Sequence, residues 1–186
     1  MTFYSFLNSL LGDVLLVSNG KALTGAYFVG QKNFPDINIT RWVNTPDLEV
    51  FAKTKAQLAE YFKGERKHFD IEYQLQGNTL QNKVWAALIQ IPSGETISYK
   101  NIANIINEPK SIRHVANSVG NNPIIIIVPC HRVIGSNGKL TGYSAGLDTK
   151  KKLLELEKQY YKDKEQYTAD FHDTRLNANF MWAYQM

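Results

Sequence analysis

Hydrophobic and polar residues in the first half of the chain follow patterns typical of a small α+β unit. In DVLLVSNGKALTGAYFVG, apolar runs flank Asn19-Gly20, a pair that accepts the positive φ angles of a tight turn, so we predict a β-hairpin. TPDLEVFAKTKAQLAEYFKG predicts a helix with Thr45 as its cap and Pro46 in its first turn. Its apolar face comprises Leu48, Phe51, Leu58 and Phe62. HFDIEYQLQG predicts a strand that ends at Gly77-Asn78.

The pattern then changes to short helices. TLQNKVWAALIQIPSG predicts a capped helix. Its buried face comprises Val84, Trp85, Leu88 and Ile89. SYKNIANIINEP predicts a second helix, capped by Ser98 and ended at Glu108-Pro109, since the residue before a proline avoids the helical region. SIRHVANSVG follows at once, and two short helices joined by a tight connection form a helix-turn-helix pattern.

The second helix of this pair has two distinct faces. Helical spacing predicts that Ile112, Val115, Ala116 and Val119 are buried together. The opposite face carries Arg113, His114, Asn117 and Ser118. This polar face fits either an ordinary solvated surface or a recognition helix that lies on DNA.

The stretch IIIIVPCHRVIGSNGKLTGYSAG predicts a buried strand over Ile124–Val128, followed by a PCHR segment and a glycine-rich loop. DTKKKLLELEKQYY predicts a last helix capped by Asp148. The polar and aromatic tail from Tyr161 matches no pattern. We therefore expect an N-terminal domain over 1–77, a second domain over 78–160 and a tail over 161–186.

Composition and charge also bear on the cellular compartment and on the type of partner. The 186 residues are 44% hydrophobic and 20% charged, which is enough for a folded core, and the net charge is +4. The excess of positive charge falls in residues 79–160, with 10 Lys and Arg against 5 Asp and Glu, and it favours a polyanionic partner. MTFYSFLNSLLGDVLL has no basic segment and no long apolar run. We expect no signal peptide, no membrane span and a cytoplasmic location, or a nuclear one in a eukaryote.

The chain's single cysteine, Cys130, has several interpretations. It fits a buried core thiol. A metal site is disfavoured, because zinc sites usually use several Cys or His and this chain has one Cys and four scattered His. A cysteine hydrolase would need a histidine distant in sequence, and nothing around His68, His114 or His172 resembles a catalytic signature, whereas His131 is adjacent. Neighbouring side chains on a strand point apart, so a Cys130–His131 link needs a turn or a bridging water. Such a link would lower the pKa of the thiol, and Glu157 is a candidate to orient the imidazole.

These residues resemble a known family, the O6-alkylguanine-DNA alkyltransferases. PCHRV is similar to the family's active-site signature. VWAALIQIPSGETISY, then Arg113, then GNNPIIIIVPCHRVIGSNGKLTGYSAGLDTKKKLLELE follow the family pattern in order and spacing. The resemblance covers residues from about 79 to 157, and it implies an α+β fold. That fold is a small RNase H-like α/β domain followed by a mostly helical, winged-helix-like domain with a helix-turn-helix.

The resemblance implies direct DNA repair in a single turnover. The alkyl group of O6-alkylguanine in double-stranded DNA passes irreversibly to Cys130, while His131 takes the thiol proton through a water and Glu157 orients His131. The family flips the damaged nucleotide out of the duplex and binds the minor groove, which small residues can approach closely. Whether O4-alkylthymine is also a substrate stays open.

The resemblance also implies further site residues. Arg113 would occupy the space left by the flipped nucleotide, and Tyr99 would help to rotate it and contact the guanine edge. Asn122 would hold the active-site turn. Ala116 and Asn117 would face DNA, the backbone carbonyls of Cys130 and Val133 would accept from the base, and a closing loop would contribute Tyr143 and Ser144.

Other functions remain open as alternatives. A non-catalytic alkylguanine-recognition protein of the alkyltransferase-like type would lack the acceptor thiol, so Cys130 argues against it. A helix-turn-helix regulator would need a more basic recognition face, and a hydrolase would turn over repeatedly. We expect no cofactor, no metal, no membrane partner and a monomer. Some family members bind zinc through cysteines in the first domain, but this chain has none there.

Overall fold

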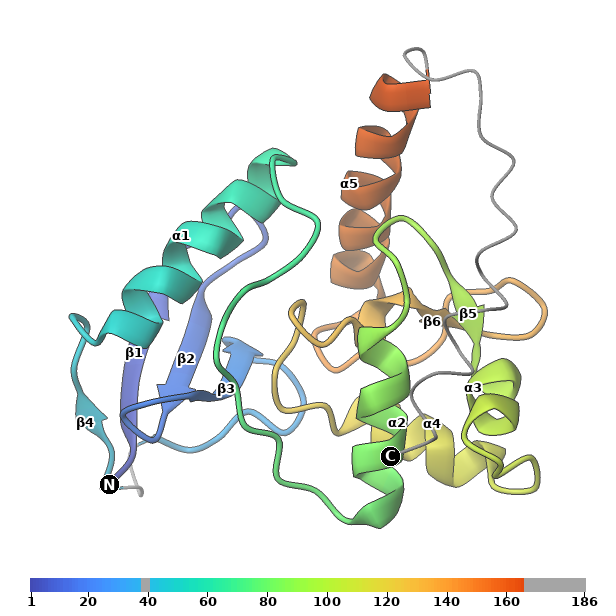
Figure 1. The fold of residues 1–186 in the computed structure, drawn as a ribbon, viewed down its shortest axis with the longest axis horizontal. Coiled ribbons are helices and arrows are strands. Elements are labelled where there is room, and N and C mark those ends of the chain that lie inside the picture. The colour runs from blue at the N-terminus through green and yellow to red at the C-terminus, as the bar shows by residue number, and fades with distance from the viewer. Residues whose placement is uncertain (38–40, 166–186) are drawn as a thin grey trace.

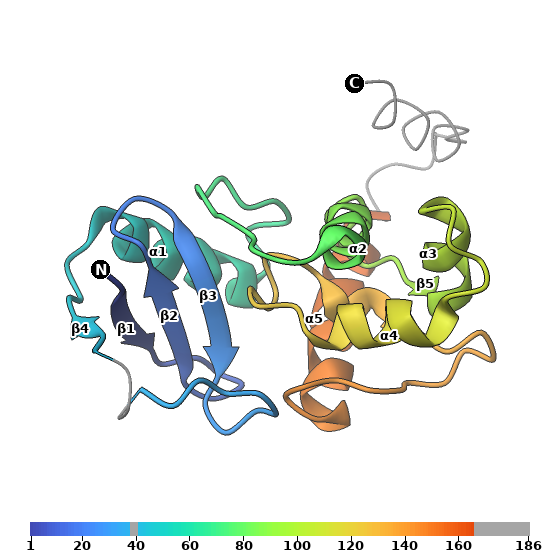
Figure 2. The ribbon, with the colours of Figure 1, turned by 90° about the horizontal axis from the view of Figure 1, so that it is seen from below.

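The computed structural model describes residues 1–37 and 41–165, which form two domains lying side by side (Figure 1). The first domain contains a sheet in the order β3-β2-β1-β4. Its strands are β1 (Phe3–Leu7), β2 (Val14–Ser18), β3 (Leu23–Phe28) and β4 (Val43–Asn44). Strand β2 is antiparallel to β1 and β3, and β4 is parallel to β1. Helix α1 (Glu49–Lys63) packs on one face of the sheet (Figure 2).

The predicted hairpin is confirmed as β2 and β3. Gly20 has a φ of 101°, and the Oδ1 atom of Asn19 accepts hydrogen bonds from the backbone amides of Lys21 and Ala22 at 3.0 and 2.9 Å. The cap predicted for α1 is wrong, because the helix begins after Leu48 and not after Thr45. The backbone amide of Thr45 donates instead to the carbonyl of Tyr4, which continues the pairing of β4 with β1 and holds Thr45 outside the helix.

The second domain contains four α-helices and a short two-stranded sheet among its described residues. Its elements are α2 (Thr79–Ile89), β5 (Ile97–Ser98), α3 (Tyr99–Ile105), α4 (Ile112–Gly120), the 3-10 turn η1 (Cys130–Arg132), β6 (Val133–Ile134) and α5 (Leu147–Glu165). The cap predicted for α3 is confirmed, since Ser98 Oγ accepts from the amide of Asn101. Asp148 is not the cap of α5 but lies in its first turn, where it pairs with Lys152.

Two segments predicted as strands each form only a single β-bridge, and both bridges lie on the same edge of β3. Leu23 bridges to Tyr73 in the connection between the domains, and Ala26 bridges to Ile124. Each segment finds only one β3 residue to pair with, so neither the strand predicted in HFDIEYQLQG nor the one predicted over Ile124–Val128 forms. The Ala26 bridge ties the sheet of the first domain directly to the turn that leads to Cys130.

The buried side chains form one hydrophobic cluster that is shared by both domains. It includes Leu16, Phe51 and Leu58 from the first domain, with Trp85, Val115 and Leu153 from the second. Ile89, predicted to be buried, is exposed near the end of α2. The predicted α+β class is confirmed. The domain limits stay a prediction, and the predicted tail lies outside the described residues apart from the end of α5, which runs to Glu165.

Candidate active site

Cys130 begins η1 immediately after a compact turn of buried apolar residues. Ile126 in this turn adopts a φ of 68°, which is uncommon for a β-branched residue. Asn122 stabilises the turn, since its Nδ2 donates to the carbonyl of Val128 at 2.7 Å and its Oδ1 accepts from the amide of Ile124 at 3.0 Å. The same Nδ2 lies 3.1 Å from Cys130 Sγ. The role predicted for Asn122 as a holder of the turn therefore agrees with its contacts.

A buried network of charged and polar side chains lies next to the cysteine. His131 Nε2 is 2.8 Å from Glu157 Oε1, which joins η1 to α5 as the sequence predicts. Arg132, for which the sequence indicated no role, donates to both carboxylate oxygens and to the carbonyl of Ile91. The backbone amide of Gly94 donates to Glu157 Oε2 at 3.0 Å. All three side chains are buried, so the carboxylate is held by donors on every side.

These contacts determine the protonation states of the pair. Burial lowers the pKa of His131 below its ordinary value, although the Glu157 charge opposes this effect, so the imidazole is neutral near neutral pH. Burial alone would raise the pKa of Glu157, but His131 and Arg132 outweigh it and hold the carboxyl ionised. Nε2 therefore carries the proton and donates to Glu157. Nδ1 is left as the basic nitrogen, and it has no hydrogen-bond partner among the described residues.

The thiol itself is less acidic than an ordinary cysteine. Burial raises the pKa of Cys130, while the Asn122 hydrogen bond and the Lys150 charge only partly lower it. The side chain is 4% exposed, so desolvation of the thiolate dominates over its neighbours. The lowered thiol pKa was expected only with a Cys130–His131 link, so it stays a prediction for that link. Because the thiol is neutral, a base must take its proton when it reacts. Nδ1 of the neutral His131 imidazole is the basic nitrogen nearby in the sequence.

Lys150 is a buried cation that the sequence analysis missed. Its Nζ donates to the backbone carbonyls of Val133, Thr141 and Gly142, at 2.5, 2.8 and 3.3 Å. Tyr99 reaches the same loop, with its hydroxyl donating to the Thr141 carbonyl at 3.1 Å. Lys150 sits in a run of three lysines and looks solvated. The signal that could have found it is its spacing of three and seven residues from Leu153 and Glu157, which places all three on one buried face.

A pocket of about 700 Å³ opens between the helix-turn-helix and this loop. The predicted residues that line it are Tyr99, Arg113, Ala116, Asn117, Tyr143 and Ser144. Lys32 and Asn33 of the first domain line it as well. Tyr99 and Tyr143 both lie close enough to Cys130 to interact electrostatically with it. Cys130 itself is buried and is not among the residues that line this pocket.

The two faces predicted for the helix that is α4 are only partly correct. Val115 and Val119 are buried, but Ile112 is 39% exposed and lines the pocket together with Ala116. Ser118, predicted on the polar face, is buried, because its Oγ donates to the carbonyl of His114 and its own carbonyl accepts from the indole of Trp85. The face of α4 that borders the pocket is consequently small and partly apolar.

Two backbone carbonyls expected to bind a base already have partners within the protein. The Val133 carbonyl accepts from Lys150, and the Cys130 carbonyl accepts from the Val133 amide. Each carbonyl has a second lone pair available to a ligand. The Ser144 carbonyl accepts from the Lys32 amide at 2.9 Å, so the first domain holds the loop that carries Tyr143 and Ser144.

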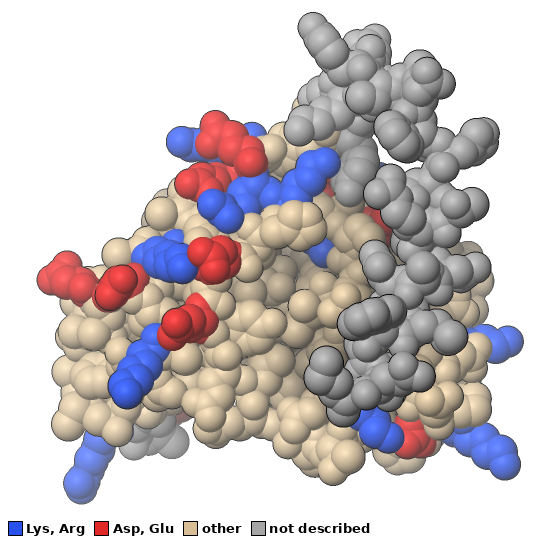
Figure 3. Space-filling view, viewed as in Figure 1, with Lys and Arg blue, Asp and Glu red and all other residues tan. Residues whose placement is uncertain are grey.

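Surface charge, possible metal ligands and helix length bear on which functions the protein can have. On the face shown in Figure 3, acidic and basic side chains are mixed over the first domain, and the hollow between the domains shows few charges. A separate cavity of about 350 Å³ is lined by residues such as His68, Pro129 and Arg132. Within residues 1–37 and 41–165, no group of three or more His, Cys, Asp or Glu could hold a metal ion. No helix in the same ranges is long and apolar enough to cross a membrane.

A helix-turn-helix next to a buried cysteine, with a histidine and a glutamate behind it, defines a DNA-binding protein with a reactive thiol. Comparison with known families agrees in both domains. A family model of the 6-O-methylguanine DNA methyltransferase DNA-binding domain matches residues 79–159, and one of the ribonuclease-like domain of the same enzymes matches residues 2–75. The chain therefore belongs to the O6-methylguanine DNA methyltransferase family.

Individual relatives support this assignment. A methylated-DNA–protein-cysteine methyltransferase of Mycobacterium tuberculosis is 46% identical over 158 residues, which are 85% of this chain and 93% of the relative. One of Methanosarcina barkeri is 43% identical over 155 residues, or 83% and 96%. A crystal structure of M. tuberculosis OGT in complex with DNA superimposes with a TM-score of 0.79 at 44% identity, covering 85% of this chain and 94% of that one.

Proposed function

We propose that this protein repairs DNA by moving the alkyl group of O6-alkylguanine onto Sγ of its own Cys130, once per molecule. The chain is a methylated-DNA–protein-cysteine methyltransferase. The observation that carries the proposal is a buried thiol that interacts with Tyr99 and Tyr143, two residues of the open pocket at the helix-turn-helix. The next residue along the chain is a neutral imidazole bonded to an ionised carboxylate. Relatives of 38–46% identity named for this activity support it.

The chemistry begins with a proton transfer. Because burial keeps Cys130 protonated, a base must remove its proton as it attacks. The basic Nδ1 of His131 has this role through a bridging water, and Glu157 stabilises the imidazolium that forms. Lys150 and Asn122 favour the thiolate by charge and hydrogen bonding. The two neighbouring groups that lower the thiol pKa thus act in the direction of the reaction.

The transfer itself is a displacement at the alkyl carbon. The bond from Sγ to carbon forms as the bond from carbon to O6 breaks, and the electron pair of the broken bond passes to the guanine. The proton removed from the thiol balances the charge of the restored guanine. A donor near O6 stabilises that charge, and the Ser144 amide has this role in the proposal. A thioether has no proton to lose and no easy leaving group, so the reaction stops after one turnover.

The depth of Cys130 explains why the nucleotide must leave the duplex. A thiol that is 4% exposed cannot reach a base inside stacked DNA, so the base has to enter the protein. Arg113 is exposed at the rim of the pocket and fills the space in the stack, while Ala116 and Asn117 allow α4 to approach the minor groove closely. Tyr99 and Tyr143 contact the extruded base. We expect the protein to act as a monomer in the cytoplasm, or in the nucleus of a eukaryote.

Product analysis tests this function. The protein is mixed in increasing amounts with a duplex that carries one O6-methylguanine, and the nucleosides are quantified after digestion. The proposal predicts that restored guanine increases in proportion to protein with a ratio that does not exceed one. Several guanines per protein molecule would contradict a self-alkylating mechanism. Tight, selective binding without any restored guanine would favour the alternative of a damage-recognition protein.

A further inference from the structure

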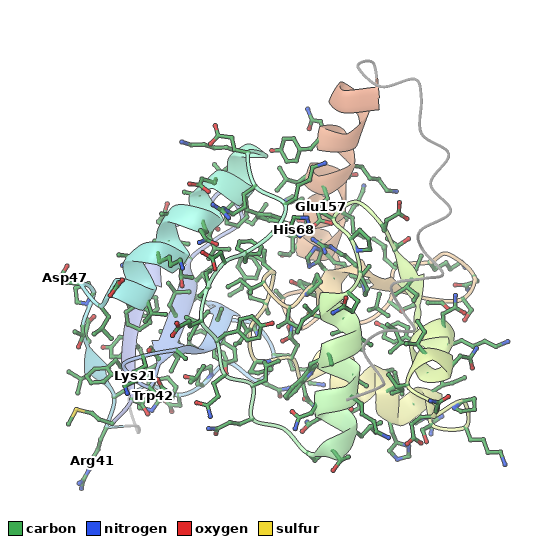
Figure 4. All side chains as sticks on the ribbon, in the orientation of Figure 1. Lys21, Arg41, Trp42, Asp47, His68 and Glu157 are labelled. Atoms are coloured by element: carbon green, nitrogen blue, oxygen red, sulfur yellow. The ribbon has the colours of Figure 1, made fainter. Side chains whose placement is uncertain are left out.

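Tyr61 brings the first domain into contact with the carboxylate of the active site. This residue lies on α1, is 2% exposed, and packs its ring against those of Phe62 and Phe69. Its hydroxyl donates to Glu157 Oε1 at 2.8 Å, across 96 residues of sequence. Figure 4 shows Glu157 on the side of α5 that faces α1. The hydrogen bond thus crosses from one domain to the other.

The oxygen that Tyr61 contacts is the one that orients the imidazole. Glu157 Oε1 also accepts from His131 Nε2 and from Arg132 Nη2, each at 2.8 Å. The other donors to the carboxylate, Arg132 and the Gly94 amide, come from the second domain. Among the described residues, Tyr61 is the first domain's contribution to this carboxylate. Losing its hydroxyl would leave Oε1 with donors from His131 and Arg132 alone, and free to rotate toward them.

The direction of this hydrogen bond is fixed. Burial and the charge of Glu157 raise the pKa of Tyr61 well above its ordinary value, so the phenol keeps its proton at any pH at which the protein works. An ionised carboxylate only accepts hydrogen bonds, so the phenol always donates here. A donor on Oε1 draws negative charge away from the contact with His131. It therefore limits how strongly Glu157 raises the pKa of His131, and so helps to keep the resting imidazole neutral and able to accept a proton.

We propose that Tyr61 is a positioning residue of the alkyl-transfer site, whose hydroxyl fixes the Glu157 carboxylate and makes the first domain part of the catalytic arrangement. This inference rests on the proposed function of His131 and Glu157. It explains why α1 places a tyrosine rather than another apolar residue on its buried face. The first domain then contributes to the chemistry as well as to the packing of the chain.

A pair of matched variants tests the proposal. Tyr61→Phe removes only the hydroxyl and keeps the ring in the core. Tyr160→Phe makes the same change at the same α1–α5 contact, where the hydroxyl donates to the Phe62 carbonyl at 3.3 Å and does not touch Glu157. The rate constant of methyl transfer is measured in single turnover with excess protein, and duplex affinity is measured separately. We expect Tyr61→Phe to lower the transfer rate constant on the order of tenfold with unchanged affinity, and Tyr160→Phe to leave both unchanged.

The pH profile distinguishes positioning from a general loss of structure. The charged and titratable groups that face His131 are Glu157, Arg132 and Lys150. Without the Tyr61 hydroxyl, Glu157 stabilises the imidazolium more strongly, so the acidic limb of the rate profile should move to higher pH in Tyr61→Phe. A loss of packing alone would lower the whole profile without moving it. The larger change Tyr61→Leu should lower the unfolding free energy as well as the rate.

Two results would overturn the inference. A Tyr61→Phe protein that transfers the methyl group at the wild-type rate and with the wild-type pH profile would show that the hydroxyl positions nothing. Equal losses in Tyr61→Phe and Tyr160→Phe would assign the effect to the contact between the helices. In both cases wild-type protein still methylates itself, so the proposed function stands. If wild-type protein restores no guanine, the proposed function fails, and this inference fails with it.

Discussion

The side-chain amide of Asn122 lies 3.1 Å from the sulfur of Cys130 and donates toward it, while the same nitrogen donates to the Val128 carbonyl at 2.7 Å. One amide therefore shapes the turn that presents the cysteine and also favours its thiolate. Burial raises the pKa of the thiol, and this hydrogen bond opposes that effect. Structure and reactivity of the site depend on the same side chain.

Replacing Asn122 with alanine should affect both properties. The change leaves the amide of Ile124 without its partner in a buried turn and removes one of two donors to the Val128 carbonyl, so we expect the unfolding free energy to fall by about 1–3 kcal/mol. The pKa of Cys130 should rise further, which moves the alkaline onset of its reaction with iodoacetamide to higher pH. Asn104→Ala on the exposed side of α3 is the control. An unchanged onset of thiol reactivity in Asn122→Ala would contradict the role assigned to this hydrogen bond.

Glu157→Gln should lower the unfolding free energy and remove the part of its pH dependence that comes from this carboxylate. Breaking a buried ion pair leaves Arg132 without its partner, which typically costs about 3–5 kcal/mol. Because the folded protein holds the pKa of Glu157 below the ordinary 4.5, the carboxylate contributes stability above that pH, and this contribution is lost as the pH falls through the folded pKa. The difference in urea stability between wild type and variant should therefore be full at neutral pH and shrink below about 4.5.

The exposed Glu155→Gln on the same helix is the matched control, and it should change the unfolding free energy by less than about 1 kcal/mol. A difference between wild type and Glu157→Gln that does not vary with pH would contradict an ionised carboxylate at this position.

Lys150 should give a titration of the same sign in the alkaline range. The folded protein lowers its pKa from 10.5 to about 8, mainly through burial, so between these values the unfolded chain binds a proton that the folded protein does not. Stability from this group therefore increases as the pH rises from about 8 to about 10.5. Lys150→Met removes this titration and three hydrogen bonds, and should lower the unfolding free energy by about 1–3 kcal/mol at pH 7.

The stability advantage of wild type over Lys150→Met should then grow in alkaline solution. Lys151→Met, at an exposed position of α5, is the control and should show no such growth. A constant advantage across this pH range would contradict the lowered pKa of the buried lysine.

Arg113→Ala should separate base extrusion from chemistry. Arg113 is exposed, lines the pocket and forms no hydrogen bond with His131 or Glu157 within the described part of the chain, so its loss should slow methyl transfer from duplex DNA on the order of tenfold or more. Transfer from the free base O6-methylguanine needs no extrusion and should keep the wild-type rate. Lys110→Ala, an exposed change of charge just before α4, controls for general attraction to DNA. Equal losses on the duplex and on the free base would contradict this role.

Local sequence signals predicted the elements that depend on a few neighbouring residues. Asn19-Gly20 identified the hairpin and Ser98 identified the start of α3, because a turn pair and a capping hydroxyl act within four residues. The apolar run before Cys130 contains no turn pair and no capping residue, and its uninterrupted apolar residues show neither helical nor strand periodicity. Its backbone polar groups are satisfied by Asn122 and by internal turn contacts, which hydrophobicity alone cannot distinguish from those of a strand.

The site was predicted where family motifs mark it and missed where contacts are distant in sequence. His131 and Glu157 come together as expected, and the link from Cys130 to His131 through a water stays a prediction. Tyr61 was missed because a tyrosine in a helix looks ordinary until the two domains pack. Lys150 was missed because a lysine in a run of lysines looks solvated until α5 packs against the loop within its own domain. Arg132 belonged to the recognised motif, but its role became visible only with its bonds to Glu157.

Intact-protein mass spectrometry with peptide mapping tests the central claim most directly. The protein is mixed with a duplex that contains one O6-methylguanine, and its mass is followed over time with the DNA in excess. Our account predicts one methyl increment, located on the peptide that contains Cys130, and no second increment. An unchanged protein mass while guanine is restored, or a methyl group on another residue, would contradict Cys130 as the acceptor.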